Sequence, residues 1–177
     1  MVCAAVDEGM QKGEEIMTHI MKMYWDMNSE KLRKVLAERT DLNSCNYKDL
    51  VKLTFDTIYN SDEGHMNYYK LNTGAITEID DGDYQGTLLF TIPFHTYQPG
   101  ASEYIMTFIE YGSCSGCDSL QAAKDWHTDK LTEEQIKDFM VICKDLVCNA
   151  IKPFNYGWRA DERWNIVEEK KDEERNS

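Results

Sequence analysis

The sequence predicts an α+β fold: N-terminal helices, then a central antiparallel β-hairpin or small sheet, then a C-terminal antiparallel pair of helices. Three observations support this order. The first sixty residues contain no proline and carry apolar residues at helical spacing. Residues 87–96 and 103–111 are rich in β-branched and aromatic residues and flank the dipeptide Pro99-Gly100. After Gly112 the apolar pattern becomes helical again, so helices are expected on both sides of the strands along the chain.

The N-terminal part of the chain is predicted to form three helices. Ile20 and Tyr24 belong to an apolar series at helical spacing in the first of them. A second helix is expected to begin at Ser29. A third is expected to begin at Asn46, because Asp49 follows three residues later and completes a cap.

The central part is predicted to form strands. Residues 75–79 are a short strand candidate, and residues 80–83, Asp-Asp-Gly-Asp, read as a turn. Proline followed by glycine suits the two central positions of a type II turn, so 87–96 and 103–111 are expected to form a hairpin. A turn centred on Pro99-Gly100 places Cys114 opposite residue 85.

The last third is predicted to form two helices. Ser115 is expected to cap a helix that runs to about Trp126, with Asp118 three residues after the cap. Thr132, followed three residues later by Gln135, is expected to cap a long final helix. The predicted buried stripe of this helix consists of Ile136, Phe139, Met140, Cys143, Val147 and Ala150.

The chain of 177 residues is predicted to fold as one domain over residues 1–167, with a charged, disordered tail at 168–177. Residues 158–167 are interpreted as a last strand or an extended arm. No apolar run approaches the roughly 20 residues that span a bilayer, and the N-terminus lacks the features of a secretory signal. Six cysteines in a chain that is large enough not to need disulfides indicate a cytoplasmic protein with reduced thiols.

The acidic residues are concentrated in the middle of the chain. The formal net charge is −13, and residues 61–129 carry 11 acidic residues against two basic ones, Lys70 and Lys124. This charge argues against binding nucleic acid through its phosphates. Two interpretations remain: a solvated face, or an acidic patch that docks on a basic protein surface. The residues assigned to the patch are Glu78, Asp80, Asp81 and Asp83.

The sequence Cys114-Ser115-Gly116-Cys117 is the most distinctive chemical feature. A Cys-x-x-Cys between a strand and a helix is used for redox exchange, because the helix N-terminus lowers a thiol pKa. The same spacing lets two thiolates bind one zinc ion. The remaining interpretation is that both cysteines only pack.

Spacing along the predicted helices identifies a third zinc ligand. If the helices that begin near 115 and 133 pair antiparallel, Cys143 lies beside Cys117. Cys148 fits the fourth position less well, because it lies about 140° round the helix from Cys143. Cys45 could contribute from a loop. The sequence therefore predicts a structural zinc site at Cys114, Cys117 and Cys143.

The redox alternative assigns Cys114 as the attacking thiolate and Cys117 as the resolving thiol. Thioredoxin-type enzymes place a βαβ unit before the motif and a cis-proline strand beside it. Here a hairpin precedes the motif, and the one later proline, Pro153, ends a helix. The four histidines are scattered and show no catalytic spacing.

Residues 111–121, Tyr-Gly-Ser-Cys-Ser-Gly-Cys-Asp-Ser-Leu-Gln, resemble a motif in small, mostly uncharacterised proteins encoded by bacteriophages. The resemblance covers the hairpin, the motif and the final helix. In its small size, acidity and CxxC motif the chain also resembles the zinc-containing anti-CRISPR inhibitors. The resemblance implies a viral protein located in the host cytoplasm.

Together these observations predict a non-catalytic, zinc-stabilised binding protein. The resemblance implies that it inhibits a host defence nuclease, such as a CRISPR-associated nuclease, by occupying its basic surface. Direct binding to nucleic acid or to a membrane is not expected. The alternatives are a thiol–disulfide oxidoreductase that uses Cys114 and Cys117, and a structural or assembly protein.

Overall fold

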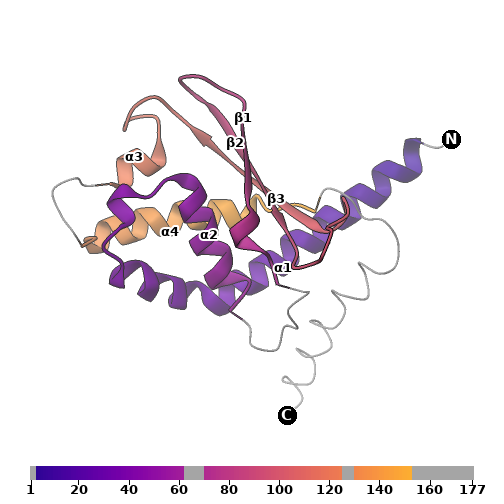
Figure 1. The fold of residues 1–177 in the computed structure, drawn as a ribbon, viewed down its shortest axis with the longest axis horizontal. Coiled ribbons are helices and arrows are strands. Elements are labelled where there is room, and N and C mark those ends of the chain that lie inside the picture. Colours follow the sequence, from indigo (N-terminus) through magenta and orange to yellow (C-terminus); the bar gives the residue numbers. More distant parts are fainter. Residues whose placement is uncertain (1–2, 62–69, 125–129, 153–177) are drawn as a thin grey trace, which may run out of the picture.

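The computed structural model describes residues 3–61, 70–124 and 130–152, with side chains from Met17 onward (Figure 1). Helices pack against a three-stranded antiparallel sheet, so the predicted α+β class with C-terminal helices is confirmed. The predicted arm at 158–167 and tail at 168–177 lie outside the described residues. The elements are α1 (Cys3–Glu38), the 3-10 turn η1 (Leu42–Ser44), α2 (Tyr47–Ile58), the 3-10 turn η3 (Thr73–Ala75), β1 (Thr77–Asp80), β2 (Gly86–Pro93), β3 (Tyr104–Tyr111), α3 (Ser119–Ala123) and α4 (Glu133–Cys148).

The first helix is longer than predicted. The chain stays helical through Ser29, where a new helix was expected to begin, and ends only at Glu38. Its buried side chains continue at helical spacing past that point, through Leu32 and Leu36. No proline or glycine interrupts this stretch, so nothing in the local sequence ends the helix there.

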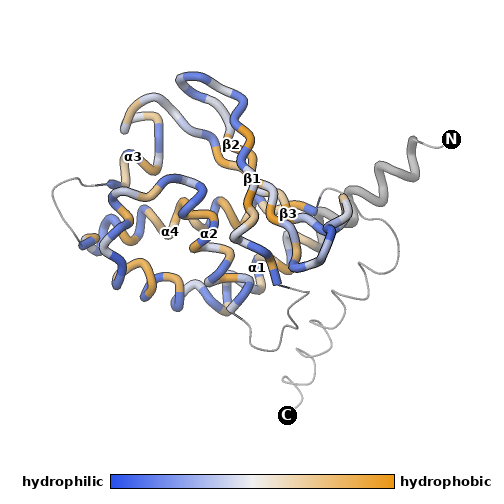
Figure 2. The backbone as a smooth tube through the Cα atoms, viewed as in Figure 1, coloured by the Kyte–Doolittle hydropathy of each residue, from blue (hydrophilic) through white to orange (hydrophobic). Residues whose placement is uncertain are grey.

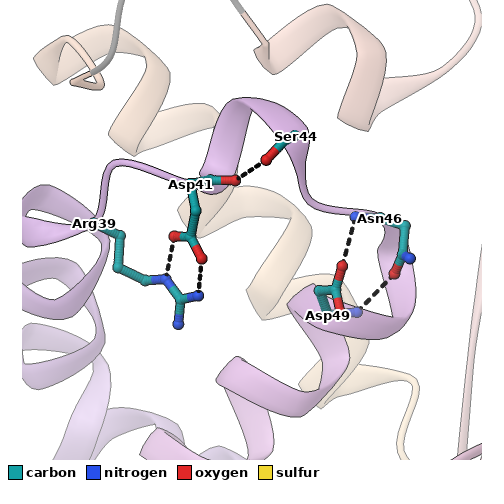
Figure 3. A network of polar contacts seen from close by, with 5 residues as sticks. All are labelled: Arg39, Asp41, Ser44, Asn46 and Asp49. Atoms are coloured by element: carbon teal, nitrogen blue, oxygen red, sulfur yellow. Dashed lines mark hydrogen bonds and ion pairs between the residues drawn. The ribbon is translucent and has the colours of Figure 1, made fainter.

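The start of α2 confirms the predicted cap at Asn46. The Asn46 side chain accepts a hydrogen bond from the Asp49 amide, and the Asp49 carboxylate accepts one from the Asn46 amide (Figure 3). Just before it, the Arg39 guanidinium binds the Asp41 carboxylate through two contacts, and the Ser44 hydroxyl donates to the Asp41 carbonyl. These contacts fix the short connection between α1 and α2.

The hairpin forms, but its register differs from the predicted one by two residues. Pro93 lies opposite Tyr104, where a turn centred on Pro99-Gly100 would place Met106. The strands are joined by a loop longer than a two-residue turn: the Phe94 amide donates to the Glu103 carbonyl at 2.9 Å in the same register, and the Glu103 amide donates to the Gly100 carbonyl at 2.8 Å within the loop. A shift of two residues leaves each side chain on its predicted face of the sheet.

Helix α4 is the central element of the fold, since it contacts α1, α2, α3 and β3 (Figure 1). It begins with the predicted capping box of Thr132 and Gln135. The Thr107 hydroxyl on β3 donates to the Leu146 carbonyl at 2.6 Å, which ties the sheet to this helix. One cluster of buried side chains joins the helices and the sheet. Hydrophobic residues alternate with hydrophilic ones along these elements in Figure 2. Within the described residues, no helix is both long and apolar enough to cross a bilayer.

Candidate functional site

The two motif cysteines lie together in a tight turn that follows β3. The amides of Cys117 and Asp118 both donate to the Cys114 carbonyl, at 2.9 and 2.8 Å. The two sulfur atoms are 3.1 Å apart, and both residues are exposed to solvent. The structure therefore presents two adjacent, accessible thiols, as the motif predicted.

The turn lowers the pKa of the Cys117 thiol. Its pKa is lowered, first by the hydrogen bond with the Cys114 side chain and then by the Cys114 backbone amide. That amide donates to the Cys117 sulfur at 3.3 Å. Both contacts favour the thiolate form, because they place a donor on the developing negative charge. The acidity thus comes from the turn itself.

Gly112 permits this arrangement because it has no side chain. A β-carbon at this position would lie 2.5 Å from the Cys117 sulfur and 2.4 Å from the Cys117 carbonyl oxygen. The Cys117 side chain therefore lies directly over the backbone of Gly112. Gly116, inside the motif, is different: a β-carbon there would be 3.8 Å from the Cys114 sulfur, an ordinary contact.

Asp118 anchors the turn to the rest of the protein. It is 4% exposed. Its carboxylate accepts hydrogen bonds from the Gln121 amide at 2.7 Å, the Tyr47 hydroxyl at 3.2 Å and the Gly112 amide at 3.4 Å. The Tyr47 hydroxyl in turn accepts from the Leu120 amide at 3.1 Å. One carboxylate thus joins the end of β3, the start of α2 and the start of α3.

The predicted helix cap at Ser115 is wrong. Asp118 is the N-cap, and α3 covers only Ser119–Ala123. The reason is the turn: the Cys114 carbonyl takes the Cys117 and Asp118 amides, so residues 114–117 close on themselves before a helix begins. Asp118 was expected three residues after the cap as its partner, and in the structure it is itself the cap.

The predicted third zinc ligand does not lie with the other two. Cys143 is fully buried, and its thiol contacts the Thr54 side chain on α2. Burial raises the pKa of Cys143 to about 12. Because α3 is a helix of five residues, it does not extend along α4 as the predicted hairpin of helices required. The stripe that carries Cys143 faces inward as predicted, but it meets α2.

The other predicted ligands are also distributed over the fold. Cys45 is buried, and desolvation raises its pKa to about 11. Cys148 is exposed at the end of α4. Among the described residues, no group of three His, Cys, Asp or Glu side chains could hold a metal ion together. Cys114 and Cys117 fit two positions of a zinc site, and these parts of the chain provide no third.

The acidic residues assigned to the patch surround the connection between β1 and β2. Glu78, Asp80, Asp81 and Asp83 are all exposed. Asp80 accepts a hydrogen bond from the Gly82 amide at 3.0 Å, and Asp81 accepts one from the Thr87 amide at 2.6 Å. The connection is hydrophilic in Figure 2. The two ordered carboxylates therefore have fixed positions at this end of the sheet.

The acidic connection and the dithiol turn lie at the same end of the sheet (Figure 1). Gly86, where β2 begins, lies opposite Tyr111, where β3 ends. The Tyr111 hydroxyl donates to the Asp80 carboxylate at 2.7 Å. This hydrogen bond raises the pKa of Tyr111 to about 12, and the charges of Asp81 and Asp83 contribute. The negative charge of this connection therefore acts on the Tyr111 hydroxyl.

Between Lys70 and Lys124 the chain contains no lysine or arginine. This stretch forms the whole sheet, the dithiol turn and α3. The uniform negative charge of this half of the fold is a property of its sequence, and the structure adds that the dithiol lies within it. The acidic residues of the stretch are Glu78, Asp80, Asp81, Asp83, Glu103, Glu110 and Asp118.

A separate pocket of about 320 Å³ lies between the end of α1 and the start of α2. Sequence patterns gave no indication of it. Four of its charged side chains have internal partners. Arg39 pairs with Asp41, and Asp49 belongs to the helix cap (Figure 3). Asp56 accepts hydrogen bonds from Thr73 and Asn60. These contacts are structural and identify no ligand.

Comparisons with protein-family models, with curated proteins and with solved structures found no match to this chain.

Proposed function

We propose that this protein acts through reversible thiol–disulfide exchange at Cys114 and Cys117. The observation that carries the proposal is the pair of exposed sulfur atoms, 3.1 Å apart. A disulfide bond of about 2.05 Å needs them to approach by only about 1 Å. The lowered pKa of Cys117 supports it as the attacking thiolate, which reverses the roles expected from the sequence.

The exchange takes place in two steps that balance without a further reactant. The Cys117 thiolate attacks one sulfur of a substrate disulfide, forms a mixed disulfide and releases a thiolate. Cys114 then attacks the Cys117 sulfur, closes the Cys114–Cys117 disulfide and releases the second thiol of the substrate. Two electrons pass from the protein to the substrate.

The first prediction concerns equilibration with a dithiothreitol redox buffer. We expect the Cys114–Cys117 disulfide to form and to be reduced reversibly, with a single midpoint for a two-electron couple. Alkylation followed by peptide mass spectrometry measures the oxidised fraction. Cys114→Ser and Cys117→Ser should each abolish the intramolecular disulfide, and Cys148→Ser, which alters an exposed thiol elsewhere, should leave it intact. Two motif thiols that stay reduced in fully oxidising buffer would contradict the proposal.

A second candidate function is recognition of a basic protein surface by the acidic end of the sheet. The absence of lysine and arginine from residues 71–123 favours it, together with the exposure of the four assigned acids. Enzymes that hold nucleic acid in a basic channel, CRISPR-associated nucleases among them, have surfaces of this charge. A zinc ion is not needed for such binding.

The second prediction tests this recognition with a decalysine peptide as the probe. Neutralising Glu78, Asp80, Asp81 and Asp83 to their amides should weaken binding about tenfold, because it removes the charges nearest the probe. Affinity in wild type should also fall as salt rises. The matched control neutralises four exposed acids on helices, Asp26, Glu30 and Glu38 of α1 and Asp138 of α4. Equal weakening by both sets, measured by calorimetry, would show that total charge alone determines binding.

A further inference from the structure

We propose that the dithiol reacts selectively with disulfides that carry positive charge, such as a disulfide between cysteines flanked by lysine or arginine. This inference rests on the proposed exchange reaction and adds the class of its substrate. It links two features of the sequence, the CxxC motif and the acidic patch.

The thiols lie just beyond the end of β3. The Cys117 sulfur lies directly over Gly112, the residue that follows Tyr111. Cys114 follows Tyr111 by three residues, so their α-carbons are at most about 10 Å apart. Both thiols are exposed, so a substrate must approach this end of the sheet from solvent.

Two carboxylates of the acidic connection have fixed positions. Tyr111 binds the Asp80 carboxylate directly, and Asp81 is fixed by its hydrogen bond with the Thr87 amide. At about 0.01 M salt the Debye length is roughly 30 Å, so at low ionic strength the charge of these carboxylates is not screened from a substrate disulfide at the thiols. No lysine or arginine of residues 71–123 offsets that charge.

This negative charge affects the rate of exchange. A site surrounded by one sign of charge raises the local concentration of oppositely charged reactants and lowers that of like-charged ones, by about 10-fold or more. The attacking thiolate is itself negative, so the same preference continues into the first bond-forming step. The main causes of the lowered Cys117 pKa are hydrogen bonds within the turn, and removing the charge of the carboxylates leaves these bonds in place.

The test compares three disulfides that differ in charge: cationic cystamine, neutral hydroxyethyl disulfide and anionic glutathione disulfide. Stopped-flow rates of oxidation of the reduced protein are divided by the rates of dithiothreitol with the same reagents, which removes their intrinsic reactivity. We expect the normalised rate to be about 10-fold higher for cystamine than for glutathione disulfide at low ionic strength, with the neutral reagent between them. Added salt should reduce this ratio toward one.

In a variant with Asp80→Asn, Asp81→Asn and Asp83→Asn, the ratio of the normalised cystamine rate to the glutathione disulfide rate should fall most of the way to one. Asparagine keeps one oxygen acceptor at each position and removes the charge. The matched control is the triple neutralisation of Asp26, Glu30 and Glu38 on α1, which lies away from this end of the sheet (Figure 1). It should keep the ratio.

The outcomes separate the two proposals. If none of the three disulfides oxidises the dithiol, the exchange function itself is wrong. If all three react with normalised rates that do not depend on charge or salt, exchange stands and the substrate class is wrong. The salt dependence is measured on wild type, so the inference can be overturned even if the triple variant fails to fold.

Discussion

Replacing Gly112 with alanine is expected to disrupt the dithiol turn and to lower the free energy of unfolding by about 1–3 kcal/mol. The new methyl group would lie 2.4 Å from the Cys117 carbonyl oxygen and 2.5 Å from its sulfur. A backbone atom cannot rotate away as the end of a side chain can, so Cys117 must move relative to β3. Urea unfolding measures the loss of stability, and the dithiothreitol titration should show a markedly smaller oxidised fraction.

Gly116→Ala is the matched control for this prediction. It makes the same change four residues later, where the new methyl group meets only the Cys114 sulfur at 3.8 Å. We expect stability and the oxidised fraction close to those of wild type. If both alanine variants behave alike, the close approach of Cys117 to Gly112 does not position the dithiol.

Local signals in the sequence predicted local structure well. The caps of α2 and α4 each depend on two residues three positions apart, and both form as expected. The inward stripe of α4 also follows from spacing along a single helix: Ile136, Phe139, Cys143 and Val147 are buried, whereas Met140, also predicted to be buried, is only partly so. In these cases each residue and its partner lie within one element, so the sequence pattern includes the whole interaction.

Features that depend on distant partners could not be predicted in the same way. Asp118 caps α3 locally, but its carboxylate also accepts from Tyr47, 71 residues earlier in the chain, and no local pattern indicates that partner. Cys143 faces Thr54 because α4 packs on α2, an arrangement that no spacing along α4 specifies. The position of the acidic connection beside the dithiol depends on the register between β2 and β3, which the loop at 94–103 fixes.

Replacing Asp118 with alanine is expected to cost about 2–4 kcal/mol of stability, more than the loss of an ordinary helix cap. The carboxylate is buried and accepts from Gly112, Tyr47 and Gln121, so its removal leaves several donors without their partner. Because Cys117 is its neighbour in the chain, we also expect the oxidised fraction in the dithiothreitol titration to fall.

Asn46→Ala provides the comparison, because Asn46 is also an N-cap but is exposed and accepts only from within its own helix. Its loss should cost about 1 kcal/mol. Urea unfolding measures the stability lost in each cap variant. The same measurement on Tyr47→Phe, alone and combined with Asp118→Ala, completes a double-mutant cycle for Tyr47 and Asp118. A coupling energy of about 0.5–3 kcal/mol is expected for residues in one network. Coupling near zero, or equal costs at the two caps, would mean that Asp118 acts only on α3 and that the dithiol turn is positioned by Gly112 alone.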